Sequence, residues 1–174
     1  MRTRTSTPAE QQREMPDDVD GLLDRAYRYA FSLAHDAAEA EDLLQDACLS
    51  ILASGGSWER SYVFATIRNR FIDRYRRNRK ILFLSLDRDD DRSEEEPADL
   101  NWEAPDVLQN GLLDRALGSL RAEERETLYL AVVEGCTAKE IAELTSRPRG
   151  TILSLLYRTK AKLRDLLGKQ QALP

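Results

Sequence analysis

Residues 135–154 read GCTAKEIAELTSRPRGTILS, and this stretch decides the fold of the C-terminal part of the chain. Thr137 and Glu140 form a T-x-x-E capping box, which predicts that a helix begins here. Residues 146–148 form a short turn, and Pro148 fits the first turn of the next helix, where its missing N–H group costs nothing. The stretch therefore predicts a helix, a tight turn and a second helix.

The second of these helices carries polar and basic side chains, as a recognition helix does when a helix-turn-helix enters the major groove of DNA. Its N-terminal residues would reach base edges, and its lysines and arginines would hold phosphates. The alternative is a plain α-hairpin that serves packing alone. The polar and basic residues are Thr151, Ser154, Tyr157, Arg158, Lys160, Lys162 and Arg164.

Apolar residues also crowd the start of this helix. Four of them nearly encircle one turn, so we expect at least one leucine to face outward. An outward leucine is suited to contact thymine methyl groups, the other half of the chain or a regulator. The four residues are Ile152, Leu153, Leu155 and Leu156.

Upstream of this motif, the spacing of apolar residues predicts further helices. Helical spacing covers residues 22–34, and Asp36 can cap a second helix over residues 37–53. A long third helix is predicted over residues 58–80. Because β-branched residues are sparse and alternating strand patterns are absent, we expect an all-α fold.

The third helix is strongly basic and is interleaved with aromatic rings. Basic groups can follow a nucleic-acid backbone while rings stack on exposed bases, so the helix suits single-stranded or melted DNA. Phe64 and Phe71 fall on one helical stripe and are predicted to pack in the core. Trp58 and Tyr62 are better candidates for base contact. The basic residues are Arg60, Arg68, Arg70, Arg74, Arg76, Arg77, Arg79 and Lys80.

The helix over residues 37–53 carries the opposite charge. An acidic, amide-bearing helix face is either simply solvated or a docking face for a basic protein partner. The residues that form this face are Glu39, Glu41, Asp42, Gln45 and Asp46.

Charge is segregated along the 174 residues, which carry 26 Lys and Arg against 31 Asp and Glu. Residues 1–80 hold 13 basic and 13 acidic groups, residues 81–111 hold 2 and 10, and residues 112–174 hold 11 and 8. The middle segment repels itself, so we predict an extended acidic linker over residues 84–110. It is either a solvated spacer or a mimic of nucleic acid that lies in a basic channel of a partner.

Composition argues against several classes of protein. No apolar run is long enough for a transmembrane helix, and residues 1–18 are too polar for a signal peptide and are expected to form a flexible tail. Cys48 and Cys136 lack disulfide-scaffold or zinc-site spacing, which favours a reducing cytosol. Because His35 is the only histidine and no catalytic geometry can be nominated, most enzyme classes are poorly supported, and we expect no catalytic residue, metal or cofactor.

Two sets of motifs together resemble an extracytoplasmic-function (ECF, group IV) sigma factor of the sigma-70 family of bacterial RNA polymerase. The family's region two has an AEDLxQ helix followed by an N-x-x-x-D-x-x-R helix, to which residues 40–46 and 69–76 correspond. Its region four has an L-x-x-x-x-R segment, an E-I-A helix and a G-T-V-x-S sequence. Residues 120–125, 140–144 and 150–154 correspond to these.

The resemblance implies two small helical domains, a region-two three-helix bundle over residues 19–83 and a region-four helix-turn-helix bundle over residues 111–170. It implies a cytoplasmic bacterial protein that inserts in no membrane and binds core RNA polymerase at the clamp helices and the flap. An anti-sigma protein is a further partner, since such proteins commonly hold ECF factors inactive. The residues implied for binding the clamp helices are Glu41, Asp42, Gln45 and Asp46.

The resemblance also implies contacts with promoter DNA, both duplex and single-stranded. The minus-ten element would be opened by Trp58, Arg60, Tyr62, Arg68, Asn69, Arg70, Asp73, Arg74, Arg76 and Arg77. The minus-thirty-five element would be read by Thr137, Lys139, Arg147, Arg149, Gly150, Thr151, Ser154, Tyr157, Arg158, Lys160 and Lys162.

The chain departs from the family at three places. Tyr62-Val63 replaces the usual Trp-Leu, the stretch between Gln45 and Tyr62 is shorter than usual, and Leu153 and Leu155 stand where basic residues are common. Two alternatives follow. One is a stand-alone helix-turn-helix regulator, and the other is a sigma-like adaptor that binds polymerase or a regulator without normal promoter reading.

Overall fold

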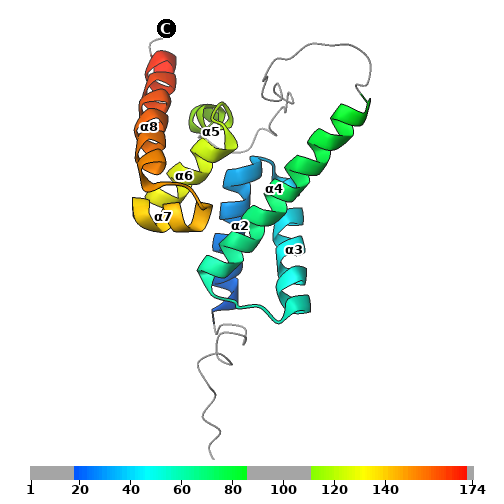
Figure 1. Ribbon diagram of the computed structural model, residues 1–174. Helices are drawn as coiled ribbons and strands as arrows, with labels where there is room; N and C mark the ends of the chain where they lie inside the picture. The colour runs from blue at the N-terminus through cyan, green and yellow to red at the C-terminus, as the bar shows by residue number, and fades with distance from the viewer. Residues whose placement is uncertain (1–17, 86–110, 172–174) are drawn as a thin grey trace, which may run out of the picture.

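The structure is a computed structural model that describes residues 18–85 and 111–171. Throughout these two ranges the regular secondary structure is helical, which confirms the all-α fold class (Figure 1). The predicted linker lies almost entirely outside the described residues. The described helices are α2 (Val19–Ala34), α3 (Ala37–Ser54), α4 (Arg60–Ser85), α5 (Gly111–Gly118), α6 (Ala122–Val132), α7 (Ala138–Thr145) and α8 (Arg149–Gln171).

The first three helices begin and end at residues suited to those positions. Asp18 and Asp36 cap α2 and α3, accepting from the backbone N–H groups of Gly21 at 3.0 Å and Glu39 at 2.8 Å. His35 closes α2 in the left-handed conformation, and Gly55 closes α3 in the same way, with a φ of 61°. The boundaries of α2 and α3 therefore follow from local capping chemistry.

Helix α4 begins at Arg60, two residues later than predicted, because Ser57 accepts from the N–H of Glu59 at 3.1 Å and holds the preceding loop. The core of this bundle combines apolar side chains from all three helices and from that loop. Phe64 is buried as predicted, and Phe71 is partly buried against the core. The buried residues are Ala26, Tyr29, Ala30, Leu33, Ala40, Leu43, Ala47, Ile51, Trp58, Val63, Phe64 and Ile67.

The last four helices contain the predicted helix, turn and helix. Thr137 and Glu140 form the predicted capping box at the start of α7. Ser146 ends α7 in the left-handed conformation, with a φ of 54°, and α8 follows after three residues. Ile141 of α7 and Ile152 of α8 are buried together in the core, which fixes how the two helices cross.

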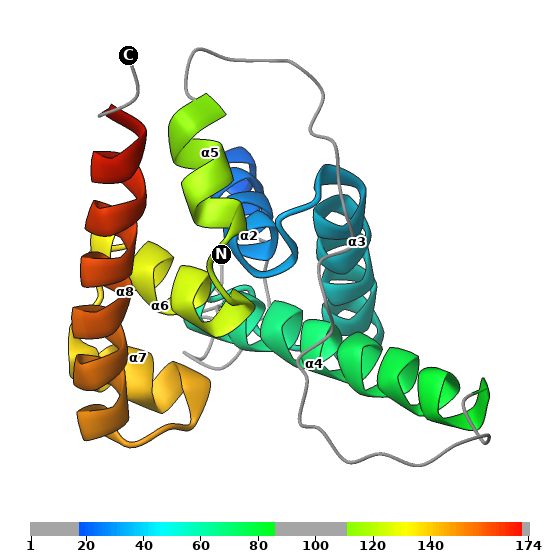
Figure 2. The ribbon, with the colours of Figure 1, turned by 90° about the horizontal axis from the view of Figure 1, so that it is seen from above.

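The two groups of helices pack against each other. Helix α6 lies against α2, and α7 approaches α4, as Figures 1 and 2 show from two directions. Leu130 and Ile141 join the same buried cluster as the residues of α2, α3 and α4. The two domains therefore share a contact surface in addition to the chain that joins them. Within the described residues, no helix is long and apolar enough to cross a bilayer.

Candidate nucleic-acid and partner interfaces

The acidic face of α3 is bound to the basic helix α4 at one point. Glu41, Asp42 and Gln45 are exposed, and Asp46 is partly buried. Arg74 of α4 reaches across with one nitrogen 2.7 Å from Asp46 and another 3.5 Å from Asp42. The hydrogen bond that Arg74 donates to the Asp46 carboxylate raises the pKa of the guanidinium, so the group stays charged. Arg74, predicted to contact DNA, thus points at the face predicted to bind polymerase.

This face continues into two leucines that sequence reasoning missed. Leu49 and Leu52 follow Gln45 by four and seven residues, so they lie on the same side of α3. Each is 59% exposed although its neighbours Ala47 and Ile51 are buried. The helical spacing could have predicted that these two leucines are exposed, since neither falls on the stripe of residues that α3 buries. An acidic face that ends in exposed leucine suits a partner helix with both basic and apolar side chains.

Trp58 occupies a different place from the one predicted. Its side chain is buried, with 7% exposed, and belongs to the core of the first three helices, so it is not displayed to a base here. Tyr62 is 42% exposed and lies over the preceding loop. A Cβ atom on Gly56 would come within 2.8 Å of the Tyr62 ring, so a larger residue there would push the ring aside. Of the two aromatic candidates, Tyr62 is the accessible one.

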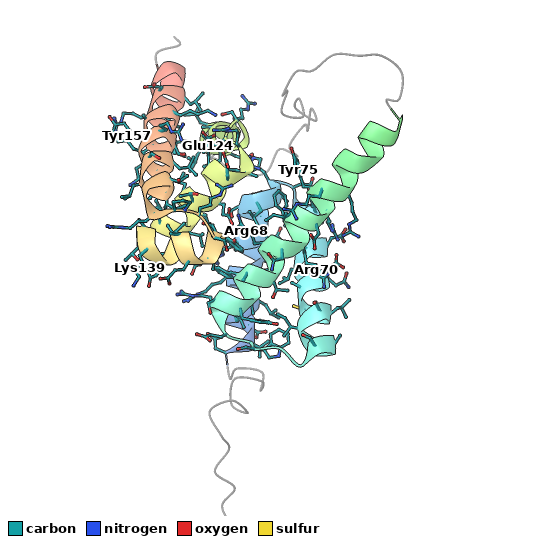
Figure 3. The ribbon with its side chains drawn as sticks, in the orientation of Figure 1. Arg68, Arg70, Tyr75, Glu124, Lys139 and Tyr157 are labelled. Atoms are coloured by element: carbon teal, nitrogen blue, oxygen red, sulfur yellow. The ribbon has the colours of Figure 1, made fainter. Side chains whose placement is uncertain are left out.

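The other polar residues of α4 form two groups, those held by hydrogen bonds to the protein and those exposed to solvent. Arg70 donates to the Ser50 hydroxyl at 2.7 Å, which orients it toward α3, as Figure 3 shows. The exposed polar residues of α4 that were predicted to contact the minus-ten element are Arg60, Asn69, Asp73, Arg76 and Arg77.

Two residues of α4 that were predicted to contact DNA form ion pairs with the second domain; Arg60 remains 47% exposed, whereas Arg68 is only 14% exposed. Arg68 lies 2.9 Å from Glu126, and Arg60 lies 3.1 Å from Glu134, both carboxylates belonging to the second domain. The buried Tyr29 hydroxyl donates to the same Glu126 oxygen at 2.7 Å. Burial and the nearby Glu126 carboxylate raise the pKa of Tyr29 well above its usual value, so the phenol remains a donor.

The recognition helix α8 presents an open polar surface. Leu155 is buried at 3% exposure while Leu153 is 49% exposed, which confirms that at least one leucine faces outward. Tyr157 is 78% exposed, on the side of α8 turned away from α2–α4 (Figure 3). The exposed residues among those predicted to read the minus-thirty-five element are Thr137, Lys139, Arg149, Gly150, Thr151, Ser154, Tyr157, Arg158, Lys160 and Lys162.

Two predicted DNA contacts of the second domain are held by α6. Arg147 lies 2.8 Å from Glu123, and Lys162 lies 3.1 Å from Glu124. Burial acts to raise the pKa of Glu124, but hydrogen bonds from the Arg121 backbone and from Lys162 outweigh it and leave the pKa below its usual value. These pairs hold α8 against α6, and Arg147 is partly buried while the Lys162 side chain remains 42% exposed.

An apolar groove of about 770 Å³ runs between the two domains on the side of α5. Its walls come from α2, α5, α6 and α8, and its rim includes the exposed Leu113, Val132 and Val133. The groove can accept an apolar side chain of a partner. Its other apolar lining residues are Tyr27, Phe31, Leu117, Leu128, Tyr129 and Leu163.

Two models of known protein families match the two domains described above. The model of sigma-70 region 2 matches residues 19–81, and the model of sigma-70 region 4 matches residues 110–163. The chain is 32% identical to the RNA polymerase sigma factor CarQ of Myxococcus xanthus over 160 residues, which cover 87% of this chain and 83% of CarQ. This chain belongs to the sigma-70 family, in its ECF group. Members of the family are transcription initiation factors that act with RNA polymerase and are not enzymes.

Two further relatives agree with this assignment. The ECF sigma factor SigE of Mycolicibacterium smegmatis is 29% identical over 153 residues, and the chain spans only 60% of SigE's length. Among solved structures, the sigma factor RpoE of Bartonella quintana, crystallised with the anti-sigma factor NepR, matches with a TM-score of 0.66 and 25% identity. That match covers 87% of this chain and 94% of RpoE.

Proposed function

We propose that α3 docks this ECF sigma factor on the clamp helices of core RNA polymerase. The observation that carries the proposal is the continuous exposed face of α3, in which Glu41, Asp42 and Gln45 lead into Leu49 and Leu52. Carboxylates would pair with basic side chains of the clamp, and the leucines would bury apolar area at the centre of the contact.

The first domain, which we place at residues 19–83, would bind and open the minus-ten element along α4. Tyr62 is accessible for stacking on an unpaired base, and Asn69, Arg76 and Arg77 are exposed on the same helix. The buried Trp58 would support this surface from beneath. The acidic linker, which we place at residues 84–110, would pass through a basic channel of the polymerase.

The second domain, which we place at residues 111–170, would read the minus-thirty-five element with α8. Ser154, Tyr157 and Arg158 lie together on its open side, where they can reach base edges and phosphates. The polymerase flap would hold this domain at the correct distance from the first.

A regulatory protein is a further partner under this proposal. RpoE, the solved structure compared above, is bound to an anti-sigma factor. The apolar groove beside α5 offers such a protein a site that touches both domains. Because the polymerase and chromosome are cytoplasmic, we assign the chain to the bacterial cytoplasm.

The proposal is tested by Asp42→Arg in a core-polymerase pull-down followed by run-off transcription. The substitution places a positive charge in the acidic face, so core binding and transcript should both fall sharply. Asp24→Arg is the matched control, because Asp24 is exposed on α2 and pairs only locally with Arg28 in the described structure. If Asp42→Arg binds core polymerase as the wild type does, α3 is not the docking face.

The two alternatives are less well supported. The relatives named above are all sigma factors, which favours initiation with polymerase over a stand-alone regulator. The open polar surface of α8 argues against an adaptor that has lost promoter reading. Strong duplex binding by the free chain, or tight polymerase binding without any transcript, would reverse this ranking.

A further inference from the structure

Arg74 lies between two surfaces to which the proposed function assigns different partners. Its guanidinium nitrogens lie 2.7 Å from Oδ2 of Asp46 and 3.5 Å from Oδ2 of Asp42, both on the acidic face of α3. Burial raises the pKa of Glu39 in the same face, and the charge of Arg74 acts against that rise. A cation supplied by α4 therefore neutralises part of the face that we propose to dock on polymerase.

The same residue belongs to a row of arginines along α4. Arg70 precedes Arg74 by four residues and Arg77 follows it by three, so the three side chains lie on one side of the helix. Arg70 donates to the Ser50 hydroxyl of α3 at 2.7 Å (Figure 3). Arg77 is exposed and donates to the backbone carbonyl of Asp73 on its own helix at 3.2 Å. Arg74 thus stands where the row passes from α3 to the exposed part of α4.

The ion pairs of Arg74 are accessible enough to exchange partners. The side chains of Arg74, Asp46 and Asp42 are 24%, 45% and 65% exposed, so another charged group can approach them. Ion pairs at such positions contribute little net stability, because water competes for both charges. A phosphate offers arginine the same kind of charged oxygen acceptor as a carboxylate does. Arg74 can therefore leave α3 for a DNA phosphate when other cations take its place.

We propose that Arg74 couples the binding of core polymerase to the binding of the unpaired promoter strand. In the free chain Asp42 and Asp46 hold it, and when basic side chains of the polymerase pair with these carboxylates, Arg74 passes to a phosphate of the strand. This inference rests on the proposed roles of α3 and α4. Polymerase and DNA then strengthen each other's binding, because only with both bound does each of these charges have a partner.

Arg74→Gln gives the coupling a sign that a structural role does not share. Without DNA, this variant should bind core polymerase about threefold more tightly than the wild type, because the polymerase no longer has to displace an internal cation from Asp42 and Asp46. An Arg74 that only positioned the two aspartates would predict the opposite, a weaker complex. Removing a cation from a DNA-binding helix is thus expected to improve protein binding.

The experiment measures fluorescence anisotropy of the labelled full chain titrated with core polymerase. Each titration is done without DNA and with a saturating single strand that spans the minus-ten element of a promoter, identified by mapping transcript starts after overexpression. The coupling is the ratio of the two dissociation constants. It should fall about threefold in Arg74→Gln, because DNA-bound wild type has already released its aspartates. Arg74→Lys keeps the charge and should keep most of the coupling.

Arg77→Gln is the matched control, since it removes the same charge from an exposed position three residues further along α4. It should weaken binding of the strand, yet leave both the affinity for core polymerase without DNA and the coupling close to the wild-type values. Circular dichroism checks that every variant is folded. If Arg74→Gln is unfolded, Arg74→Met takes its place with the same expected result, because methionine keeps the straight apolar stem.

Two results would overturn the coupling role of Arg74. One is a folded neutral variant that binds core polymerase without DNA no more tightly than the wild type. The other is an equal gain in Arg77→Gln, which would reduce the effect to net charge. The Asp42→Arg pull-down separates these failures from failure of the proposed function. If Asp42→Arg loses core binding, α3 remains the docking face whatever Arg74 does, whereas wild-type binding by Asp42→Arg counts against the docking face itself.

Discussion

Helices α4 and α8, the two that we propose to contact DNA, differ in how their charged side chains are used. On α4, Arg60, Arg68 and Arg74 are all paired with carboxylates. On α8, Arg158 and Lys160 lie on the exposed side, and Tyr157 is the most exposed large apolar residue of the described chain. The surface that we propose to read the duplex is thus open, while three arginines of the surface that we propose to open the strands are paired with carboxylates.

This difference is consistent with what each helix would have to bind. Duplex DNA is a stable target that a preformed helix can enter without rearrangement. Unpaired DNA arises only after polymerase has engaged the promoter, so a surface for it can stay occupied until then. The predictions below test this contrast, beginning with the residue whose substitution should have the largest effect.

Trp58 and Tyr62 separate packing from DNA contact within the first domain. Trp58→Ala should lower the free energy of unfolding by about 3–5 kcal/mol, because it removes a buried indole from the core. Tyr62→Ala should cost no more than about 0.5 kcal/mol, since its ring is partly exposed. Urea unfolding of the full chain measures both values.

The same pair should behave in the opposite way in promoter opening. In the holoenzyme, permanganate reactivity of unpaired thymines should fall for Tyr62→Ala, and Tyr62→Phe should restore it because the ring is kept. If Trp58→Ala were as stable as the wild type but defective in opening, Trp58 would be a base contact after all.

The sequence predicted the fold well where the signal is local. The capping box at Thr137 and the apolar spacing of α3 each lie within a few residues, so both helices were placed correctly. The burial of Trp58 was not predicted, because Trp58 stands in the loop before α4, where no helical period marks it as buried.

The interdomain pairs could not have been predicted in this way. Arg68 and Glu126 are 58 residues apart in the chain, and a basic helix gives no indication of which carboxylate it will meet. Both residues look like ordinary surface charges in the sequence. Only the packing of α6 on α2 brings them together and removes them from water.

Leu153 tests whether the open surface of α8 reads bases through apolar contact. Leu153→Ala should weaken binding of the holoenzyme to its promoter by about 1 kcal/mol, because an exposed leucine can bury itself against a thymine methyl group. Replacing promoter thymines one at a time by deoxyuridine removes that methyl alone. One such replacement should weaken the wild type but leave Leu153→Ala unaffected.

Leu112→Ala is the matched control for this experiment, since Leu112 is exposed in the same domain but lies on α5. It should bind all the modified promoters as the wild type does. Equal sensitivity of wild type and Leu153→Ala to every deoxyuridine would assign the leucine no part in base reading.

The smallest effect is expected for Glu124 of α6, whose ion pair with Lys162 helps to hold α8 against α6. The pKa of Glu124 is lower than usual in the folded chain, so the unfolded chain binds more protons as the medium is acidified. The stabilisation is therefore present above the ordinary glutamate pKa and is lost as pH falls through the folded value. Glu124→Gln should lose less than about 1 kcal/mol at neutral pH.

Urea unfolding across a pH series measures this contribution. The difference between wild type and Glu124→Gln should shrink on acidification, because the wild-type carboxyl then becomes neutral as well. Glu143→Gln, at an exposed pair 3.9 Å from Lys139, should show no comparable trend. A difference that stayed constant with pH would mean that Glu124 braces α8 through its shape and its hydrogen bonds.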